Sequence, residues 1–355
     1  MQDGNPPVKP LVSILIPAYN AAEWLADTLR SALAQTWERK EIILVDDGST
    51  DQTVAIARRF ECDTMRVFTQ ENRGAAAARN KAFSLSHGDY IQWLDADDLL
   101  APDKISRQME QAEAGTGNRT LFSSEWAYFL HRTSRAKFVP TALWCNLSPV
   151  EWLVRKMGQN LHMQTATWLV SRELTESAGP WDTQLLGDDD GEYFCRVLLA
   201  SDGVRFVPES RVFYRASGTS SLSYIGQSDR KIDAQWRSME LHIAYLRSLE
   251  DSARTRAACV SYLQTWLIHF FPEKPGIVKQ ARSLAAELGG ALTMPKLSWK
   301  YSWIAGVFGW RTAKRVQRSL NAARRNVERG TDRLLDRWFG GRNGSRGGDA
   351  WHCQI

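Results

Sequence analysis

The stretch Ile91–Leu100, IQWLDADDLL, decides the fold, because a short apolar run ends in three carboxylates within four residues: Asp95, Asp97 and Asp98. An apolar run of this length bounded by polar residues is typical of a buried strand. Carboxylates packed this closely repel one another, and removing them from water is costly unless a cation pairs with them. The stretch therefore predicts a strand that carries negative charge to a place where something positive binds.

Three earlier apolar runs also end in polar motifs. They are LVSILIP (11–17), EIILVDD (41–47) and MRVFTQ (65–70), which lead into PAYN, DDGSTD and QENRG. Helical segments lie between the runs, and we expect Asn20, and Ser49 or Thr50, to cap the first two. This alternation predicts parallel βαβ units with helices on both faces of one sheet. Because ligands of open α/β sheets bind at the carboxyl ends of the strands, the polar motifs should converge on one edge.

The composition of the 355 residues, with 43% hydrophobic and 24% charged, is that of a globular protein. The five cysteines form no CxxC or Cys/His ligand pattern, so we expect free thiols in a reducing, cytoplasmic setting. No signal core and no run of roughly 20 apolar residues is present, so a soluble or peripheral chain is expected. The net charge of +5 hides a basic end, since residues 296–355 carry thirteen Lys or Arg against four acids.

Several nucleotide and hydrolase motifs are missing from the sequence. There is no GxxxxGK[ST] loop, no GxGxxG after the first run and no GxSxG elbow. Metal-supported phosphate chemistry remains, because the carboxylates of Asp46, Asp47, Asp95, Asp97 and Asp98 suit Mg²⁺ or Mn²⁺ and leave room for substrate phosphates. Asp and Asn also end strands and cap helices for purely structural reasons, but two acidic strand ends on one predicted edge favour the metal.

These motifs together carry a family resemblance. In order and spacing, VSILIPAYNAAEWLADTLRSALAQTW, EIILVDDGSTDQT, QENRGAAAARNKAF and DYIQWLDADD resemble the nucleotide-binding half of family 2 glycosyltransferases, over about residues 11–220. The resemblance implies an inverting, metal-dependent enzyme that moves a sugar from a nucleotide diphosphate to an acceptor hydroxyl of a glycan or lipid-linked saccharide. The expected nucleotide is UDP. The absence of a QxxRW motif favours single addition over processive synthesis.

The implied fold class is α/β of the GT-A type: a Rossmann-like mixed sheet, mainly parallel and flanked by helices, with a helical C-terminal extension. The expected segments are a flexible N-terminus (1–10), a catalytic domain (11–225) with a nucleotide-binding half (11–100) and an acceptor half (101–225), a helical extension (226–295), a basic amphipathic segment (296–339) and a disordered tail (340–355).

The resemblance also implies the site residues. Asp47 or its neighbour Asp46 would bind the base edge, and Arg79 would lie near the base and ribose. Asp95 and Asp97 match the DxD signature that holds the ribose and a Mg²⁺ or Mn²⁺ ion, with Asp98 adjacent as a third candidate ligand. The full set expected to bind the nucleotide sugar is Pro17, Ala18, Tyr19, Asn20, Asp46, Asp47, Asn72, Arg79, Asp95, Ala96 and Asp97.

A second motif, GDDDGEYFCR (187–196), is similar to the Glu-Asp motif of the family followed by an aromatic helix. Counting back from Arg196 puts Asp189 at the Glu position and makes Asp190 the expected general base for the acceptor hydroxyl. The three consecutive acids leave that assignment open by one position. An acidic first turn stabilised by the helix dipole is the structural alternative.

The basic end combines tryptophans with a cationic helix that has a narrow apolar stripe. We expect it to bind an anionic membrane on its cytoplasmic face; a seam for a partner helix and an ordinary solvated face are the alternatives, and nucleic acid is not an expected partner. The residues concerned are Trp299, Trp303, Trp310, Ala313, Val316, Leu320, Ala323 and Val327. For the whole chain, the competing function is a non-catalytic scaffold of the same fold that binds nucleotide sugar or glycan.

Overall fold

The computed structural model describes residues 9–115, 117–216, 228–295 and 297–340. The chain divides into two compact units. The first comprises Met1–Tyr128, Lys137–Leu153 and Leu161–Leu249, and the second comprises Phe129–Ala136, Val154–Asn160 and Glu250–Ile355. Residues 1–8 of the expected flexible N-terminus and residues 341–355 of the expected tail lie outside the described residues.

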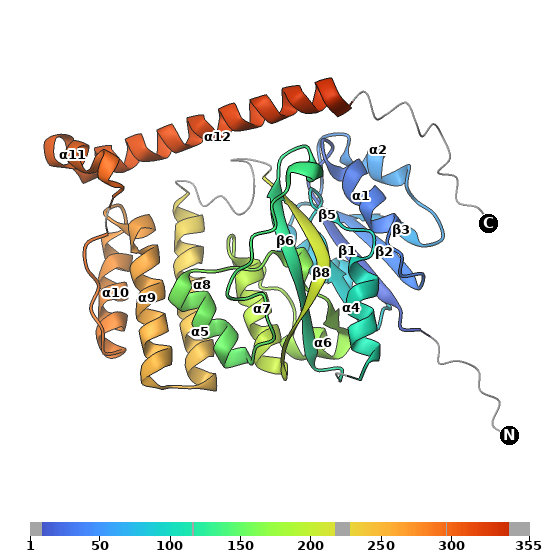
Figure 1. The fold of residues 1–355 in the computed structure, drawn as a ribbon, viewed down its shortest axis with the longest axis horizontal. Helices are drawn as coiled ribbons and strands as arrows, with labels where there is room; N and C mark the ends of the chain where they lie inside the picture. Colours follow the sequence, from blue (N-terminus) through green and yellow to red (C-terminus); the bar gives the residue numbers. More distant parts are fainter. Residues whose placement is uncertain (1–8, 116, 217–227, 296, 341–355) are drawn as a thin grey trace. The chain divides into compact units, whose positions relative to one another are not determined.

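The first unit contains a five-stranded sheet with the order β3-β2-β1-β4-β7, of which Figure 1 labels β1, β2 and β3. Its strands are β1 (Val12–Ala18), β2 (Lys40–Asp46), β3 (Met65–Thr69), β4 (Tyr90–Trp93) and β7 (Val170–Ser171). The first four are parallel to one another, and β7 runs antiparallel to β4. Every residue of β1 is buried, as expected for a parallel strand covered on both faces. The predicted mixed, mainly parallel sheet is confirmed.

The connections between the parallel strands contain α1 (Leu25–Leu33), α2 (Thr53–Arg58) and α3 (Ala75–Ser84). The expected helix caps are wrong: α1 follows Trp24 and α2 follows Gln52, in both cases without a side-chain cap hydrogen bond. Asn20 instead adopts a left-handed backbone (φ 47°), and its side chain accepts a hydrogen bond from the Thr50 N–H at 2.8 Å. The residue that was expected to cap a helix therefore joins the loops after β1 and β2.

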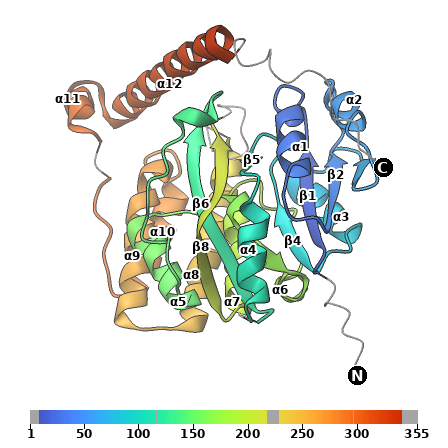
Figure 2. The same ribbon diagram turned by 45° about the vertical axis from the view of Figure 1, so that its right-hand side comes forward.

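A second, three-stranded sheet has the order β5-β8-β6, with β5 at Leu99–Leu100, β6 at Thr120–Phe129 and β8 at Gly203–Arg215 (Figure 2). The single strand β8 contains two apolar runs, VRFVP and RVFYR. Glu209 interrupts it with a left-handed φ of 62°. Glu125 of β6 spans the irregularity, since its carboxylate accepts from the Glu209 N–H at 3.1 Å and from Arg211 Nε at 2.9 Å.

Further helices complete the first unit or run on from it. They are α4 (Lys104–Glu113), α5 (Pro149–Gln159), α6 (Arg172–Ala178), α7 (Asp189–Ala200) and α8 (Asp229–Leu249), together with the short 3-10 helix η2 (Thr165–Thr167).

The second unit is helical. It contains the 3-10 helix η1 (Thr133–Arg135), α9 (Ala253–Phe270), α10 (Pro275–Glu287), α11 (Trp299–Phe308) and α12 (Trp310–Gly340). The segment FPEKPG, which contains two prolines, lies at the break between α9 and α10. Asp332 of α12 accepts hydrogen bonds from the Arg132 guanidinium at 2.7 and 3.1 Å. In the described ranges, no helix has both the length and the apolar character needed to cross a membrane.

Candidate active site

The carboxyl ends of the central strands bring the sequence motifs to one edge of the sheet. Ala18, the last residue of β1, pairs with Asp46, the last residue of β2. β4 pairs with β1 on the other side and ends at Trp93, two residues before Asp95. Because these strands are parallel, PAYN, DDGS and DADD all leave the sheet at the same edge, as expected.

Asp46 and Asp47 use their carboxylates to shape the surrounding loops. Oδ2 of Asp46 accepts from the N–H groups of Gly48 and Ser49 at 3.1 and 3.0 Å, while its Oδ1 is buried and has no protein partner among the described residues. Asp47 accepts from the N–H groups of Arg73 and Gly74 at 2.9 and 2.8 Å. The pair therefore fixes the loops that follow β2 and β3.

The loops after β1, β2 and β3 are tightly linked. Pro17 and Ala18 are buried at the end of β1, and the next residue, Tyr19, is 51% exposed. A Cβ added to Gly48 would lie 2.9 Å from the backbone nitrogen of Asn72, and Gly48 has a φ of +75°. This close approach requires glycine, and it holds the exposed Asn72 against the DDGS turn.

The three carboxylates of DADD have different surroundings. Asp95 and Asp97 are partly exposed, whereas Asp98 is fully buried. Oδ1 of Asp98 accepts from the Arg215 N–H at 2.8 Å, and its Oδ2 accepts from the Gln164 side chain. Burial, reinforced by the charges of Asp97 and Asp95, raises the pKa of Asp98 well above its ordinary value. Ala96 is buried between these two partly exposed carboxylates, and its carbonyl accepts from the Thr28 hydroxyl at 3.0 Å.

Arg79 joins the DADD motif to the GDDDGEYFCR motif. Its guanidinium donates to Asp95 Oδ1 at 2.7 Å and to Asp189 Oδ2 at 2.8 Å, although the two acids lie 16 and 110 residues away in the chain. The guanidinium is buried and stacks over the Trp181 ring at 4.4 Å. Trp181 in turn stacks on Tyr193 with 4.0 Å between ring centroids. Arg79 therefore lies between two acidic side chains of the site and stacks on a pair of aromatic rings.

The structure gives the three consecutive acids three different partners. Asp188 has a left-handed backbone (φ 55°), and its carboxylate accepts from Ser238 Oγ at 2.7 Å and Gln235 Nε2 at 3.2 Å, both on α8. Asp189 is paired with Arg79. Asp190, partly exposed, accepts from the Thr165 hydroxyl at 3.2 Å.

The electrostatics of Asp189 follow from this crowding. Burial raises the pKa of Asp189 to about 6, with the Arg79 cation opposing the shift and the charges of Asp190, Asp95 and Asp188 adding to it. The ion pair therefore only partly offsets the cost of burying this carboxylate among other acids.

The described residues contain no group of three or more His, Cys, Asp or Glu side chains that could cage a metal ion. Mg²⁺ with a nucleotide diphosphate needs no such cage, because one or two carboxylates suffice when phosphate oxygens and water fill the remaining positions. Asp95 and Asp97, both partly exposed at the strand edge, fit that requirement. Asp98 uses both of its oxygens in buried hydrogen bonds and fits it less well.

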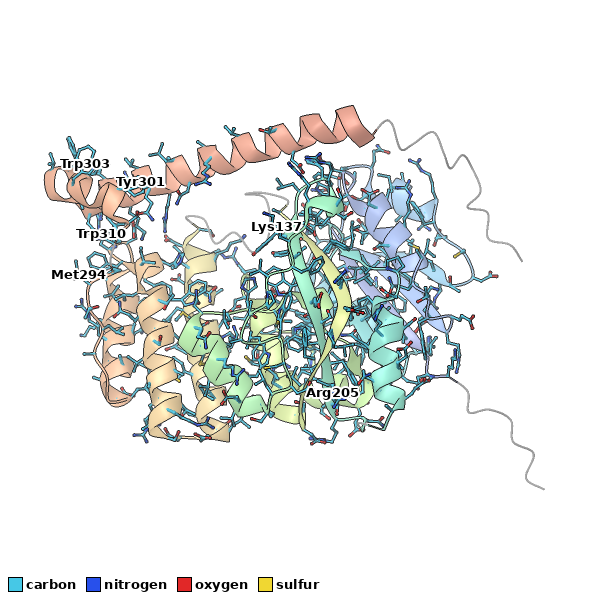
Figure 3. The ribbon with its side chains drawn as sticks, in the orientation of Figure 1. Lys137, Arg205, Met294, Tyr301, Trp303 and Trp310 are labelled. Carbon is cyan, nitrogen blue, oxygen red and sulfur yellow. The ribbon has the colours of Figure 1, made fainter. Side chains whose placement is uncertain are left out.

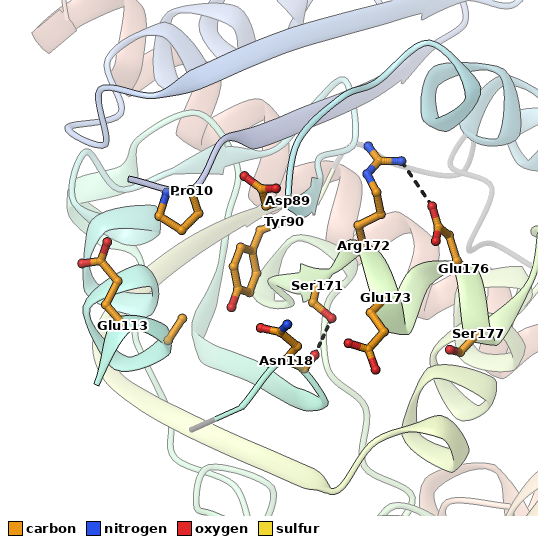
Figure 4. Close-up of a pocket in the computed structure, with 11 residues that line it drawn as sticks. Pro10, Asp89, Tyr90, Glu113, Asn118, Ser171, Arg172, Glu173, Glu176 and Ser177 are labelled. Carbon is orange, nitrogen blue, oxygen red and sulfur yellow. Dashed lines mark hydrogen bonds and ion pairs between the residues drawn. The ribbon is translucent and has the colours of Figure 1, made fainter. Parts of the chain in front are cut away.

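A cavity of about 770 Å³ lies at the opposite, amino-terminal edge of the same sheet (Figure 4). Pro10 precedes β1 and Asp89 precedes β4, and both line it. Arg172 and Glu176, also in the lining, form an ion pair at 3.7 Å. The described residues that line this cavity include none of those expected to bind the nucleotide sugar, so we assign it no part in that chemistry.

Sequence reasoning missed Trp181, Thr165 and the α8 side chains Gln235 and Ser238. Each contacts an acidic residue or arginine of the site from a distant part of the chain. Only the position of Trp181, six residues before GDDDGEYFCR in the sequence, offered a local signal.

The mainly parallel sheet flanked by helices, with acidic residues at its strand ends, is the architecture of the GT-A fold. Residues 13–175 match the model of glycosyl transferase family 2, and this segment is a family 2 glycosyltransferase domain.

Curated relatives resemble part of the chain. TuaG of Bacillus subtilis, provisionally named a teichuronic acid biosynthesis glycosyltransferase, is 45% identical over 105 residues, which cover 29% of this chain and 42% of TuaG. A glycosyltransferase of Haemophilus influenzae is 44% identical over 103 residues, covering 28% of this chain and 41% of its own length. EpsJ of Bacillus subtilis, another glycosyltransferase by name, is 27% identical over 64% of this chain and 68% of EpsJ. The chain thus spans less than half the length of the first two relatives.

Solved structures support the fold over more of the chain. A fragment of S. aureus TarS in complex with UDP-GlcNAc has a TM-score of 0.63 at 14% identity, covering 78% of this chain and 81% of that one. The same fragment in complex with UDP has a TM-score of 0.59, covering 87% of this chain and 91% of that one. At this identity the likeness shows a shared fold and nothing finer.

Proposed function

We propose that this chain transfers a sugar from a nucleotide diphosphate to an acceptor hydroxyl, with inversion at the anomeric carbon and Asp190 as the general base. The observation that carries the proposal is the division of labour among the three acids. All three acids are partly exposed, but α8 side chains hold Asp188 and the Arg79 cation holds Asp189, whereas Asp190 accepts from a neutral hydroxyl. Asp190 is therefore the carboxylate best able to accept a proton from an incoming acceptor.

The proposed reaction is a single displacement. The acceptor oxygen forms a bond to the anomeric carbon as its proton passes to Asp190, and the bond from that carbon to the diphosphate oxygen breaks, releasing the nucleotide diphosphate. Asp95 and Asp97 would hold Mg²⁺ or Mn²⁺; Asp98, the third ligand expected from the sequence, has both oxygens in buried hydrogen bonds and would support the motif from within. A divalent ion held by these carboxylates would neutralise charge that develops on the leaving diphosphate. Asp189, through its ion pair with Arg79, would hold Asp95 and the base Asp190 in fixed positions relative to each other.

We propose UDP as the nucleotide, a choice supported by the shared fold with TarS, whose fragment was solved with UDP and UDP-GlcNAc. Asp46 and Asp47, Tyr19 and Arg79 would surround the nucleoside. The proposed acceptor is a hydroxyl of a glycan or of a lipid-linked saccharide. The proposed setting is the cytoplasm at the inner face of the cell membrane; the four described cysteines are not in disulfides, which supports a reducing compartment.

The donor class can be tested by thermal unfolding of the full chain with UDP, GDP, dTDP or CMP, each with and without Mn²⁺, because a ligand that binds only the folded state raises Tm. We expect UDP with Mn²⁺ to give the largest rise and Asp97→Ala to remove it. Equal shifts for all four nucleotides, or a UDP shift that needs no metal and survives in Asp97→Ala, would contradict the assignment.

The base can be tested with Asp190→Asn, using release of UDP from a panel of UDP-sugars and saccharide acceptors. We expect at least about a 100-fold loss of turnover with nucleotide binding retained. Asp202→Asn is the matched control, since Asp202 is an acid with 71% of its side chain exposed in the same unit. A wild type that binds nucleotide but turns over no donor would favour the non-catalytic scaffold.

A further inference from the structure

Helix α11 exposes an apolar surface that a helix in water does not normally have. Its ten residues, WKYSWIAGVF, include one charged side chain, Lys300. Trp303, Val307 and Phe308 are 63%, 70% and 62% exposed. A helix that is apolar on most sides is usually buried, so we expect a binding partner to bury these three side chains.

The start of the next helix is fixed within the same unit, so α11 is not a loosely attached end. Trp310 packs edge-on against Phe271 with 4.9 Å between ring centroids. Lys314 is buried and donates to the Phe271 carbonyl and to the Glu273 carboxylate, each at 2.5 Å. In Figure 3, Trp310 lies below α11, toward α10, while Trp303 lies on the opposite, upper side of α11.

The charge next to this apolar surface is positive. Arg311, Arg315 and Arg318 follow one another at spacings of four and three, which puts them on one face of α12. Arg311 and Arg315 are exposed. Residues 297–340 contain ten Lys or Arg against three acids, so a partner that covers α11 and meets α12 should carry negative charge.

We propose that α11 and the first turns of α12 dock onto an anionic lipid surface. Trp303, Val307 and Phe308 enter the boundary between headgroups and acyl chains, and Arg311 and Arg315 meet the lipid phosphates. With ten residues, α11 is about 15 Å long, half of the roughly 30 Å hydrocarbon core, so it lies in the interface. Apolar burial and charge attraction together supply the two signals that stable peripheral binding needs. The proposal rests on this surface alone and does not depend on the transfer reaction.

The test is co-sedimentation of the full chain with vesicles of mixed phosphatidylglycerol and phosphatidylcholine, and with vesicles of phosphatidylcholine alone. We expect binding to the anionic vesicles that weakens as salt rises, and little binding to the neutral ones. The double variant Trp303→Ser/Val307→Ser should lower the partition coefficient at least about tenfold. Val139→Ser, which removes a 65% exposed side chain of the first unit, should leave it unchanged.

Either failure would overturn the proposal: no binding of the wild type to anionic vesicles, or equal binding by the wild type and the double variant. A double variant that changes the oligomeric state of the protein, with no vesicle binding by the wild type, would assign the surface to contacts between copies instead. Because both substituted side chains are exposed, Tm should match that of the wild type, and matching Tm values would exclude misfolding as the cause of lost binding.

Discussion

Gly191→Ala should show how strongly the first turn of α7 depends on the position of the Asp188 carboxylate. A Cβ at position 191 would lie 2.1 Å from Oδ1 and 2.8 Å from Cγ of Asp188, distances that real contacts do not reach. The carboxylate cannot move aside without leaving Ser238 and Gln235, which donate to its other oxygen at 2.7 and 3.2 Å.

The expected cost follows from these contacts. Each hydrogen bond to a charged group contributes about 1.5–3 kcal/mol, so losing two costs about 3–6 kcal/mol. Alanine regains about 1 kcal/mol over glycine within a helix. Allowing for partial relaxation, we expect Gly191→Ala to lower the free energy of unfolding by about 2–4 kcal/mol, measured from the urea midpoint and slope of the full chain.

Two further variants isolate the clash. Gly187→Ala is the matched control, because a Cβ there meets no atom within 4 Å. In an Asp188→Gly background the carboxylate is gone, so Gly191→Ala should become neutral or slightly stabilising. The two substitutions would then be strongly non-additive. If Gly191→Ala cost no more than Gly187→Ala, or if its cost persisted unchanged in the Asp188→Gly background, the reasoning would be wrong.

Three other variants test other parts of the structure. The pKa of Asp189, about 6 in the folded chain, exceeds the unfolded value near 3.9, so the folded state binds the proton more tightly. The free energy of unfolding should therefore fall by up to about 3 kcal/mol as pH rises from 4 to 6. In Asp189→Asn this decrease should be smaller, which urea midpoints measured at each pH would show. Burial lowers the pKa of Lys104, so its contribution has the opposite sign: stability should rise with pH toward about 10.4, and Lys104→Met should remove that rise and raise the midpoint at pH 7. Asp332→Asn weakens the hydrogen bonds from Arg132, so amides of α12 should exchange with deuterium about tenfold faster or more, while those of the central sheet keep their rates; unchanged α12 exchange would mean that this pair does not hold the helix.

The sequence predicted the parts of the fold that depend on local pattern. The continuous apolar runs ending at Ala18, Asp46 and Trp93 became buried parallel strands, and their polar ends meet at one edge. Parallel strands need only hydrophobic runs separated by helices, which is a short-range signal. The same signal placed DADD and DDGS on the expected side of the sheet.

Contacts across long stretches of chain carried no such signal. Arg79 donates to an acid 110 residues away and stacks on Trp181. No periodic pattern in the sequence predicts either contact. Asn20 failed as a predicted cap for the same reason, since a partner on another loop competed for its side chain. The runs VRFVP and RVFYR look like two strands in the sequence, but they form the single strand β8, in which a carboxylate from β6 bridges the irregularity at Glu209.

Asp98 has a consequence for any mutational scan of this protein. Its carboxylate links the DADD turn to the backbone at Arg215 and to the Gln164 side chain from inside the unit, while Asp95 and Asp97 of the same motif remain accessible. A screen that scores only product formation would group all three acids as equally essential. Pairing that score with cellular protein abundance should separate them: Asp98 substitutions should deplete the protein itself, and Asp97 substitutions should leave abundant, silent protein.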